Sequence, residues 1–144
     1  MLTLSKFFRS CLTLPGKIQS HKSKKDILRE FRKVFSSQEA KNASNVVYVF
    51  VCEKKIPRVK SESTILYIGQ TRQNLSSRYM KYAETFCSGE HWPLYNYSII
   101  HYGGIRISYL PVGTVQSLKQ AETELLTNYY KLYKEYPPRN FQRR

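Results

Sequence analysis

The spacing of apolar residues predicts helices and strands in a mixed order. Residues 24–36 place Ile27, Phe31 and Val34 on one face of a helix, and Ser23 can cap its start. Residues 46–52, "VVYVFVC", are nearly all apolar and predict a buried strand. Residues 64–69, "TILYIG", predict a second strand, close enough in sequence to pair antiparallel with the first.

The second half of the chain continues this alternation. Asn74 can cap a helix over 75–86. Residues 93–104 begin with a proline and end with a glycine pair, which favours a short helix, although "YSIIHY" within them also fits a strand. Residues 105–113 alternate and predict a third strand, and residues 117–136 form the clearest helical pattern.

These elements together predict an α+β fold with a small three-stranded antiparallel sheet flanked by helices. The polar stretch "SSQEAKNASN" at 36–45 is typical of a linker. We therefore expect two parts: a basic N-terminal extension, 1–42, with a helix near 24–36, and a domain at 43–144.

Charge points to a polyanionic partner. The 144 residues carry 24 Lys and Arg against 10 Asp and Glu, a net charge of +14 that is spread along the chain. Such an excess favours nucleic acid over an anionic membrane surface. No apolar run reaches the roughly 18 residues that a membrane span needs, so we expect no membrane partner.

The cysteines and the N-terminus bear on location. Cys11, Cys52 and Cys87 are odd in number and widely spaced, which predicts reduced thiols in an intracellular protein. Cys87 and His91 alone lack the ligands of a zinc site. The first 25 residues are basic and contain no acid, which suits an organellar transit peptide or a phosphate-binding arm equally. Without import, a prokaryotic or viral protein of this kind would be cytoplasmic.

One carboxylate stands beside the apolar stripe of the last helix. Glu122 shares a face with Leu118, Leu125 and Tyr129 at helical spacing, whereas Glu124 falls on the polar side. A carboxylate at such an edge needs a partner. It can be a salt bridge to an arginine, a metal ligand or a general acid or base. Taken singly, Tyr48 and Tyr67 fit ordinary half-buried residues of a sheet. Arg78 on its own fits a charge that is exposed to solvent.

Taken in order, five stretches resemble the GIY-YIG nuclease family. They are "VVYVF", "LYIGQT", "NLSSRY", "AETELL" and "PPRN", within residues 45–141. The first two stand where that family has its name motifs. Arg78 fits the helix arginine, Glu122 fits the metal-binding glutamate and Asn140 fits the closing asparagine. The chain departs from the pattern at Val46, where the family has glycine, and at Tyr82, where many members have histidine.

The resemblance implies metal-dependent hydrolysis of DNA phosphodiester bonds. Glu122 would hold Mg²⁺ or Mn²⁺, and Arg78 would pair with the scissile phosphate. Tyr48 is the preferred general base, with Tyr67 orienting the water, and Tyr82 and Asn140 complete the set. Gly69 is expected to let the backbone leave the strand and approach DNA. The DNA-backbone contacts are expected from Arg72, Lys81, Lys54, Lys55, Arg58 and Lys60.

Two other functions fit the same residues. One is a DNA-binding module whose nuclease centre has decayed, and the other is a basic RNA-associated structural protein. The DNA cleaved stays open among restriction, mobile-element and structure-selective repair substrates. A homodimer would suit double-strand cutting, but the sequence does not decide the oligomeric state.

Overall fold

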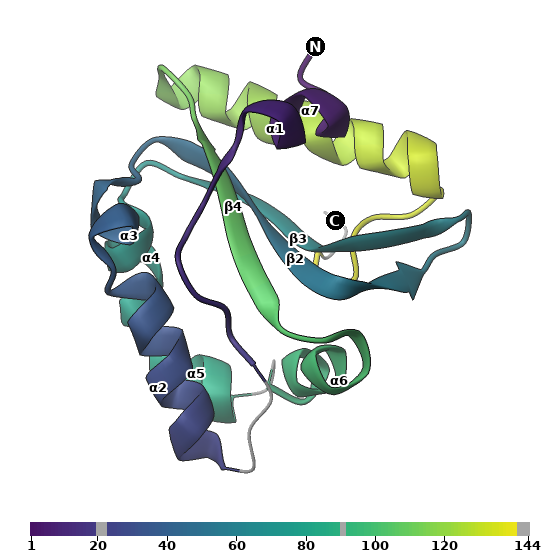
Figure 1. Ribbon diagram of the computed structural model, residues 1–144. Helices are drawn as coiled ribbons and strands as arrows, with labels where there is room; N and C mark the ends of the chain where they lie inside the picture. Colours follow the sequence, from purple (N-terminus) through teal and green to yellow (C-terminus); the bar gives the residue numbers. More distant parts are fainter. Residues whose placement is uncertain (20–22, 90–91, 141–144) are drawn as a thin grey trace.

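The computed structural model describes residues 1–19, 23–89 and 92–140, and its centre is a mixed-length antiparallel sheet. The strands are β1 (Leu12–Thr13), β2 (Val46–Pro57), β3 (Glu62–Thr71) and β4 (Ile105–Pro111), in the order β1-β4-β2-β3 (Figure 1). The α+β class is confirmed. The expected three-stranded sheet is wrong because β1, a strand of two residues, adds a fourth strand at the β4 edge. A strand this short leaves no periodic pattern to detect.

The β2–β3 hairpin confirms the predicted antiparallel pairing and extends it. β2 continues beyond the predicted run at 46–52, through the charged residues 53–55 to Pro57. The register between the two strands shifts after Phe50 and again after Val51. These irregularities mark a bulge, where a strand bends and twists more strongly. The hairpin tip therefore lies well away from the start of β2 (Figure 1).

Seven helices flank the sheet in the described residues. Ser23 and Asn74 cap their helices as predicted, each accepting a backbone N–H bond. The helix expected over 75–86 is interrupted at Lys81 and Tyr82 and forms two short helices instead. None of the described helices is long and apolar enough to cross a membrane. Their bounds are α1 Leu4–Ser10, α2 Lys24–Phe35, α3 Gln38–Asn42, α4 Leu75–Met80, α5 Ala83–Ser88, α6 Trp92–Tyr102 and α7 Val115–Tyr133.

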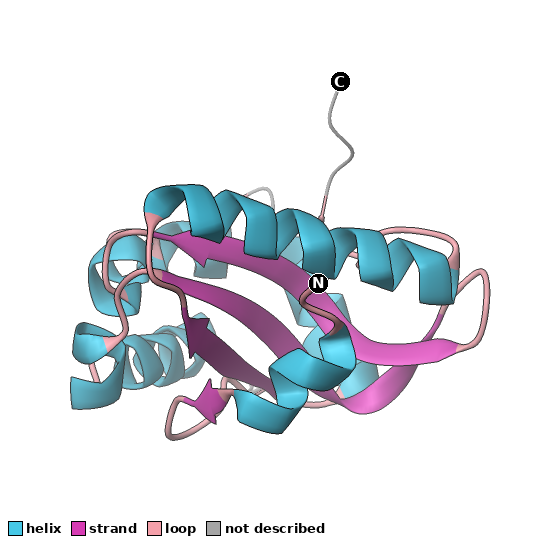
Figure 2. Ribbon diagram, turned by 90° about the horizontal axis from the view of Figure 1, so that it is seen from above, coloured by secondary structure: helices cyan, strands magenta, loops and turns pink. Residues whose placement is uncertain are grey.

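The two faces of the sheet bury different kinds of side chain. On one face, Val47, Val49 and Ile68 pack against Leu118 and Leu125 of α7. The other face carries Tyr48 and Phe50 and packs mainly aromatic residues of α2 and of the segments from α4 to α6. Alternation along β2 produces this division, since successive side chains point to opposite faces. Figure 2 shows α7 lying across the strands with α1 beside it.

The N-terminal segment packs into both cores. Glu124 and Asn128 of α7 accept backbone N–H bonds from Leu2 and Leu4, at 2.8 and 2.9 Å. Phe7 is fully buried against the α7 face. The polar side of α7 is thus occupied by residues from the other end of the chain, so residues 1–42 and 43–144 share their hydrophobic cores.

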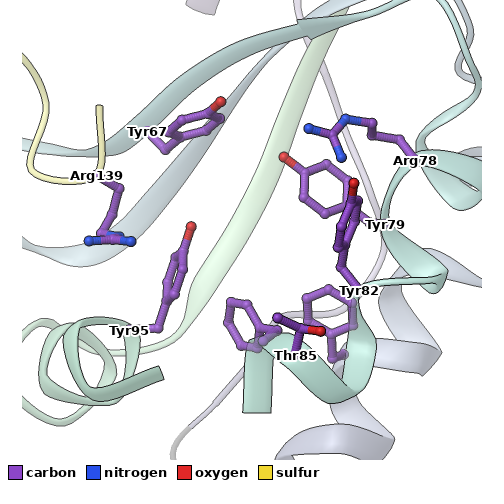
Figure 3. A pocket seen from close by; sticks show the side chains of 9 residues that line it. Tyr67, Arg78, Tyr79, Tyr82, Thr85, Tyr95 and Arg139 are labelled. Carbon is purple, nitrogen blue, oxygen red and sulfur yellow. The ribbon is translucent and has the colours of Figure 1, made fainter. Parts of the chain in front are cut away.

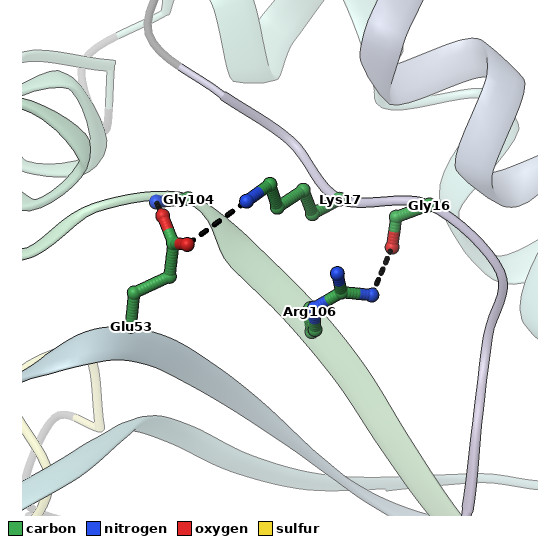
Figure 4. Close-up of polar contacts among 5 residues, drawn as sticks. All are labelled: Gly16, Lys17, Glu53, Gly104 and Arg106. Atoms are coloured by element: carbon green, nitrogen blue, oxygen red, sulfur yellow. Dashed lines mark hydrogen bonds and ion pairs between the residues drawn. The ribbon is translucent and has the colours of Figure 1, made fainter.

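A carboxylate ties this segment to the sheet (Figure 4). Glu53 on β2 receives the Lys17 ammonium at 2.8 Å and the Gly104 backbone N–H at 2.7 Å. The Lys17 bond, and then the Gly104 bond, lower the pKa of Glu53. Gly103 precedes this turn with a φ of +87°, a conformation that favours glycine.

Candidate functional site

An open cavity of about 350 Å³ lies on the aromatic face of the sheet, between the helices and the C-terminal tail. β3 contributes one residue, the α4–α5 segment most of the wall, and α2, α6 and the tail the remainder. Figure 3 shows Arg78 and Arg139 on opposite sides, with tyrosine rings around the space between them. The lining residues are Phe31, Tyr67, Arg78, Tyr79, Tyr82, Thr85, Phe86, Tyr95 and Arg139.

Tyr48 and Tyr67 come from neighbouring strands and lie on this same face. In the register of β2 and β3, Tyr48 is opposite Gly69 and Phe50 is opposite Tyr67. Paired residues share a face of the sheet, so the two tyrosine rings lie diagonally, with centroids 6.1 Å apart. Tyr67 is partly exposed and lines the cavity. Tyr48 lies below it and is 1% exposed.

Gly69 makes this arrangement of rings sterically feasible. A Cβ atom at this position would lie 2.7 Å from Tyr48 Cζ and 2.7 Å from Tyr67 Cε2. Both distances are far below an ordinary carbon contact of roughly 3.5–4.0 Å. Gly69 lies inside β3, which continues to Thr71. The expectation that it lets the backbone leave the strand is therefore wrong, and its role is to leave room for two tyrosines.

The Tyr48 hydroxyl is hydrogen bonded and buried. It lies 2.6 Å from the Tyr79 hydroxyl, and either oxygen can donate. Burial chiefly, with smaller contributions from the charges of Tyr67 and Glu122, raises the pKa of Tyr48 well above its ordinary value. Burial likewise raises the pKa of Tyr79. Both phenols therefore stay protonated near neutral pH in the free protein.

Arg78 is held by aromatic rings. Its guanidinium carbon is 5.2 Å from the centre of the Tyr79 ring and 5.1 Å from that of the Tyr82 ring. Such cation–π contacts fix a guanidinium without neutralising it. No carboxylate among the described residues pairs with Arg78. A partly buried, unneutralised cation thus faces the cavity.

Tyr82 occupies the interruption between α4 and α5. Its backbone N–H bonds to the Tyr79 carbonyl at 2.9 Å, a tight turn that separates the two helices. The ring is 42% exposed at the cavity wall. Lys81 also approaches the ring, with its ammonium nitrogen 5.5 Å from the ring centre. The helix break therefore turns Tyr82 toward Arg78.

Glu122 belongs to α7, on the other side of the sheet, and is partly buried. Its negative charge contributes to raising the pKa of Tyr48, so the carboxylate acts electrostatically on the site. Glu124 has a different role, because it binds Gln120 and the Leu2 backbone. The helix thus uses its two glutamates differently, as the polar and apolar sides of its pattern predict.

Asn140 acts on the outer edge of β3. Its amide nitrogen donates to the Ile68 carbonyl at 2.8 Å, and its amide oxygen accepts the Ile68 N–H at 2.9 Å. The Arg139 N–H also donates to the Leu66 carbonyl at 2.9 Å. The tail thereby satisfies the open edge of the strand. In the structure Asn140 supports the strand that carries Tyr67, while its neighbour Arg139 reaches the cavity.

Arg139 is only 5% exposed, and its guanidinium carbon lies 4.8 Å from the centre of the Tyr95 ring. Burial raises the pKa of Tyr95, although the positive charge of Arg139 and a hydrogen bond with it act to lower it. Sequence reasoning missed Tyr79, Tyr95 and Arg139. Nothing in the spacing separates these two tyrosines from the other ten in the chain.

The predicted DNA-binding residues fall into two groups. Arg72 and Lys81 are exposed on the segments that follow β3 and α4, at the Arg78 end of the sheet. The second group lies in β2 and the hairpin turn, at the other end: Lys54, Lys55, Arg58 and Lys60. In this group, Arg58 bonds Glu135 at 2.9 Å and the Tyr136 carbonyl at 2.7 Å, so it is already neutralised.

The side chains that could bind a metal ion limit the kind of metal site that the protein can form. The described residues contain no group of three or more His, Cys, Asp or Glu side chains placed to hold an ion. Glu122 offers a single carboxylate near Tyr48. Mg²⁺ sites completed by substrate phosphate and water need only one or two carboxylates. The described residues thus do not fit a closed, all-protein site. A substrate-completed site would depend on Glu122 alone, and this residue does not line the cavity.

No known protein family, curated protein or solved structure matches this chain in sequence or fold comparison.

Proposed function

We propose that the protein is a metal-dependent DNA endonuclease with a GIY-YIG-type centre. The observation that carries the proposal is that Tyr67 and Arg78 line one cavity, with Tyr48 buried beneath it. Glu122 does not line the cavity; it lies on α7, on the other side of the sheet, and acts on Tyr48 through its charge. These residues come from two strands and two helices separated by up to 74 positions. They match the order of motifs that carries the family resemblance.

Arg78 is the residue we assign to the scissile phosphate. Its planar guanidinium can bond two phosphate oxygens, and no carboxylate competes for it in the described residues. The adjacent phenols of Tyr48, Tyr79 and Tyr82 outweigh burial and raise its pKa, so the group stays cationic. Glu122 would hold Mg²⁺ or Mn²⁺, which when bound offsets negative charge on the phosphoryl oxygens.

Tyr48 and Tyr67 differ in exposure, and we assign their roles accordingly. Tyr67 lines the cavity and is the one placed to contact a water or phosphate oxygen. Tyr48 is buried, and its raised pKa keeps the ionised fraction at neutral pH below roughly one in a thousand. We therefore assign Tyr48 to positioning, through its 2.6 Å bond to Tyr79 beside Arg78, and reserve direct contact for Tyr67.

Incubation with plasmid and branched DNA in Mg²⁺ or Mn²⁺ tests the proposal. Glu122→Gln should reduce cleavage by at least about 100-fold while leaving DNA affinity nearly unchanged, because one metal-ligating oxygen is lost. Glu124→Gln is the matched control on the same helix, since an amide can still accept the Leu2 bond. Equal loss in both variants would overturn the assignment of Glu122.

The decayed module is the second candidate, and the buried Tyr48 favours it. A centre whose first tyrosine cannot ionise, with tyrosine at position 82, could retain DNA binding alone. Salt-dependent DNA binding without cleavage in any divalent metal would establish this alternative. An RNA-associated structural protein would instead bind RNA in preference to DNA of the same sequence, which the same binding assay measures.

A further inference from the structure

We propose that the cavity beside Arg78 holds one unpaired nucleotide of a DNA strand. The inference rests on the proposed function, since it names the class of DNA that the same site would act on. The binding determinants are Tyr82 as a stacking surface, and Arg139, which packs on the Tyr95 ring, as a second phosphate contact. None of these three follows from the metal-dependent chemistry assigned to Glu122 and Arg78.

The size of the cavity suits a single nucleotide. Its volume of about 350 Å³ is at the low end of the roughly 300–1,000 Å³ of small-molecule sites. A duplex cannot enter such a space, whereas one base and its phosphate can. A base must leave the helical stack to reach it, which costs least where the base is already unpaired.

The wall of the cavity combines flat rings with cations. Tyr82 and Tyr95 lie on opposite sides of the cavity (Figure 3). Arg139 and Phe86 already pack against the Tyr95 ring, so Tyr82 is the ring on which a single-stranded base can stack. Tyr82 is 42% exposed, with Arg78 and Lys81 beside its ring. A base would stack on the exposed part of the ring.

Arg139 supplies the second cation from the tail. It is 5% exposed, stacks on Tyr95 and lines the cavity opposite Arg78. The backbone bond from Arg139 to Leu66 and the Asn140 bonds to Ile68 hold the tail against β3. Two fixed guanidinium groups across one small cavity suit the two phosphates that flank a single extruded nucleotide.

Binding measured in EDTA tests this inference separately from cleavage. The probe is a DNA duplex with one bulged 2-aminopurine, compared with the same duplex fully paired. We expect the bulged duplex to bind at least about 10-fold more tightly, with a change in 2-aminopurine fluorescence as the base stacks. Tyr82→Ala should remove a stacking surface worth roughly 5- to 150-fold in affinity and abolish the preference.

Arg139→Lys should also weaken the preference for the bulged duplex. Tyr97→Ala is the matched control and should keep this preference, since Tyr97 is exposed on α6 outside the cavity lining. If Arg139→Lys fails to fold, Tyr82→Ala on the exposed wall still decides. Equal affinity for the two duplexes, or a preference kept in Tyr82→Ala, would overturn the inference. So would adenosine monophosphate binding as tightly as the bulged strand, because the site would then serve a free nucleotide.

The two proposals can fail independently. A bulge preference without cleavage in any metal would sustain the nucleotide site and remove the nuclease. Cleavage of paired DNA with no preference for the bulge would do the reverse.

Discussion

Replacing Gly69 with alanine should destabilise the fold through the tyrosine pair. The new methyl group would sit 2.7 Å from carbons of both Tyr48 and Tyr67 and 2.8 Å from the Tyr48 hydroxyl. Relief requires movements of roughly 1 Å from atoms that prefer about 3.5–4.0 Å. Tyr48 cannot move freely, because it is 1% exposed and bonded to Tyr79 at 2.6 Å. Overpacking of this kind costs about 1–3 kcal/mol.

This cost converts into a measurable melting shift. For 144 residues, an unfolding entropy of roughly 2.1 cal/mol/K per residue gives about 0.30 kcal/mol/K. Gly69→Ala should therefore lower Tm by about 3–10 °C in differential scanning calorimetry. It should also reduce cleavage, since any relief displaces Tyr67 from the cavity wall.

Gly113→Ala is the matched control for Gly69→Ala. A Cβ atom at Gly113 meets no atom within 4 Å, and the residue is exposed without a positive φ. Its Tm should stay within about 2 °C of the parent, as surface substitutions usually change stability by less than about 0.5 kcal/mol. A Gly69→Ala protein that melts with the parent would refute the steric argument and the packing of both rings.

Three further predictions concern other parts of the site and fold. Asn140→Ala should cost about 1–3 kcal/mol by calorimetry, because both backbone groups of Ile68 lose their partners. Asn140→Asp should also destabilise the fold, because a carboxylate oxygen, which only accepts, would then face the Ile68 carbonyl oxygen. The pKa of Glu53 lies below its ordinary 4.5, so its stabilisation exists above that pH and disappears as pH falls through the lower folded value. Glu53→Gln should therefore lower Tm more at pH 7 than at pH 3, and an equal decrease at both would contradict it. Arg72→Gln and Lys81→Gln should each reduce the slope of log K against log salt by about 0.9 in DNA-binding titrations, and an unchanged slope would exclude a phosphate contact.

Sequence patterns predicted the parts of the fold that have strong local signals. The strand at 46–52, its antiparallel partner and the caps Ser23 and Asn74 were all recovered, since each depends on residues next to one another in the chain. The short strand β1 was missed because its two residues are stabilised by β4, about 95 positions away. Tertiary pairing of this kind leaves no local pattern.

The candidate site was predicted in part for the same reason. Motif order brought Arg78 and Tyr67 to one cavity, but it did not foresee that Tyr48 would lie beneath that cavity. The turn at Tyr82 and the return of the tail to β3 decide which other side chains arrive, Tyr79 and Arg139 among them. The turn and the position of the tail both depend on backbone hydrogen bonds between distant or irregular segments, which residue spacing does not predict.

The surroundings of each cation indicate its use better than its charge does. The Arg58 side chain is 10% exposed and forms an ion pair with Glu135, so its charge is neutralised within the fold. Arg78 is held in place by Tyr79 and Tyr82, whose rings orient a guanidinium but do not cancel its charge. Because an anion binds most favourably where a cation is both fixed and unneutralised, the phosphate contacts that we propose should lie on the aromatic face of the sheet. The sequence analysis assigned Arg78 to the scissile phosphate and Arg58 to the DNA backbone, and the partner that Arg58 has in the fold counts against its assignment.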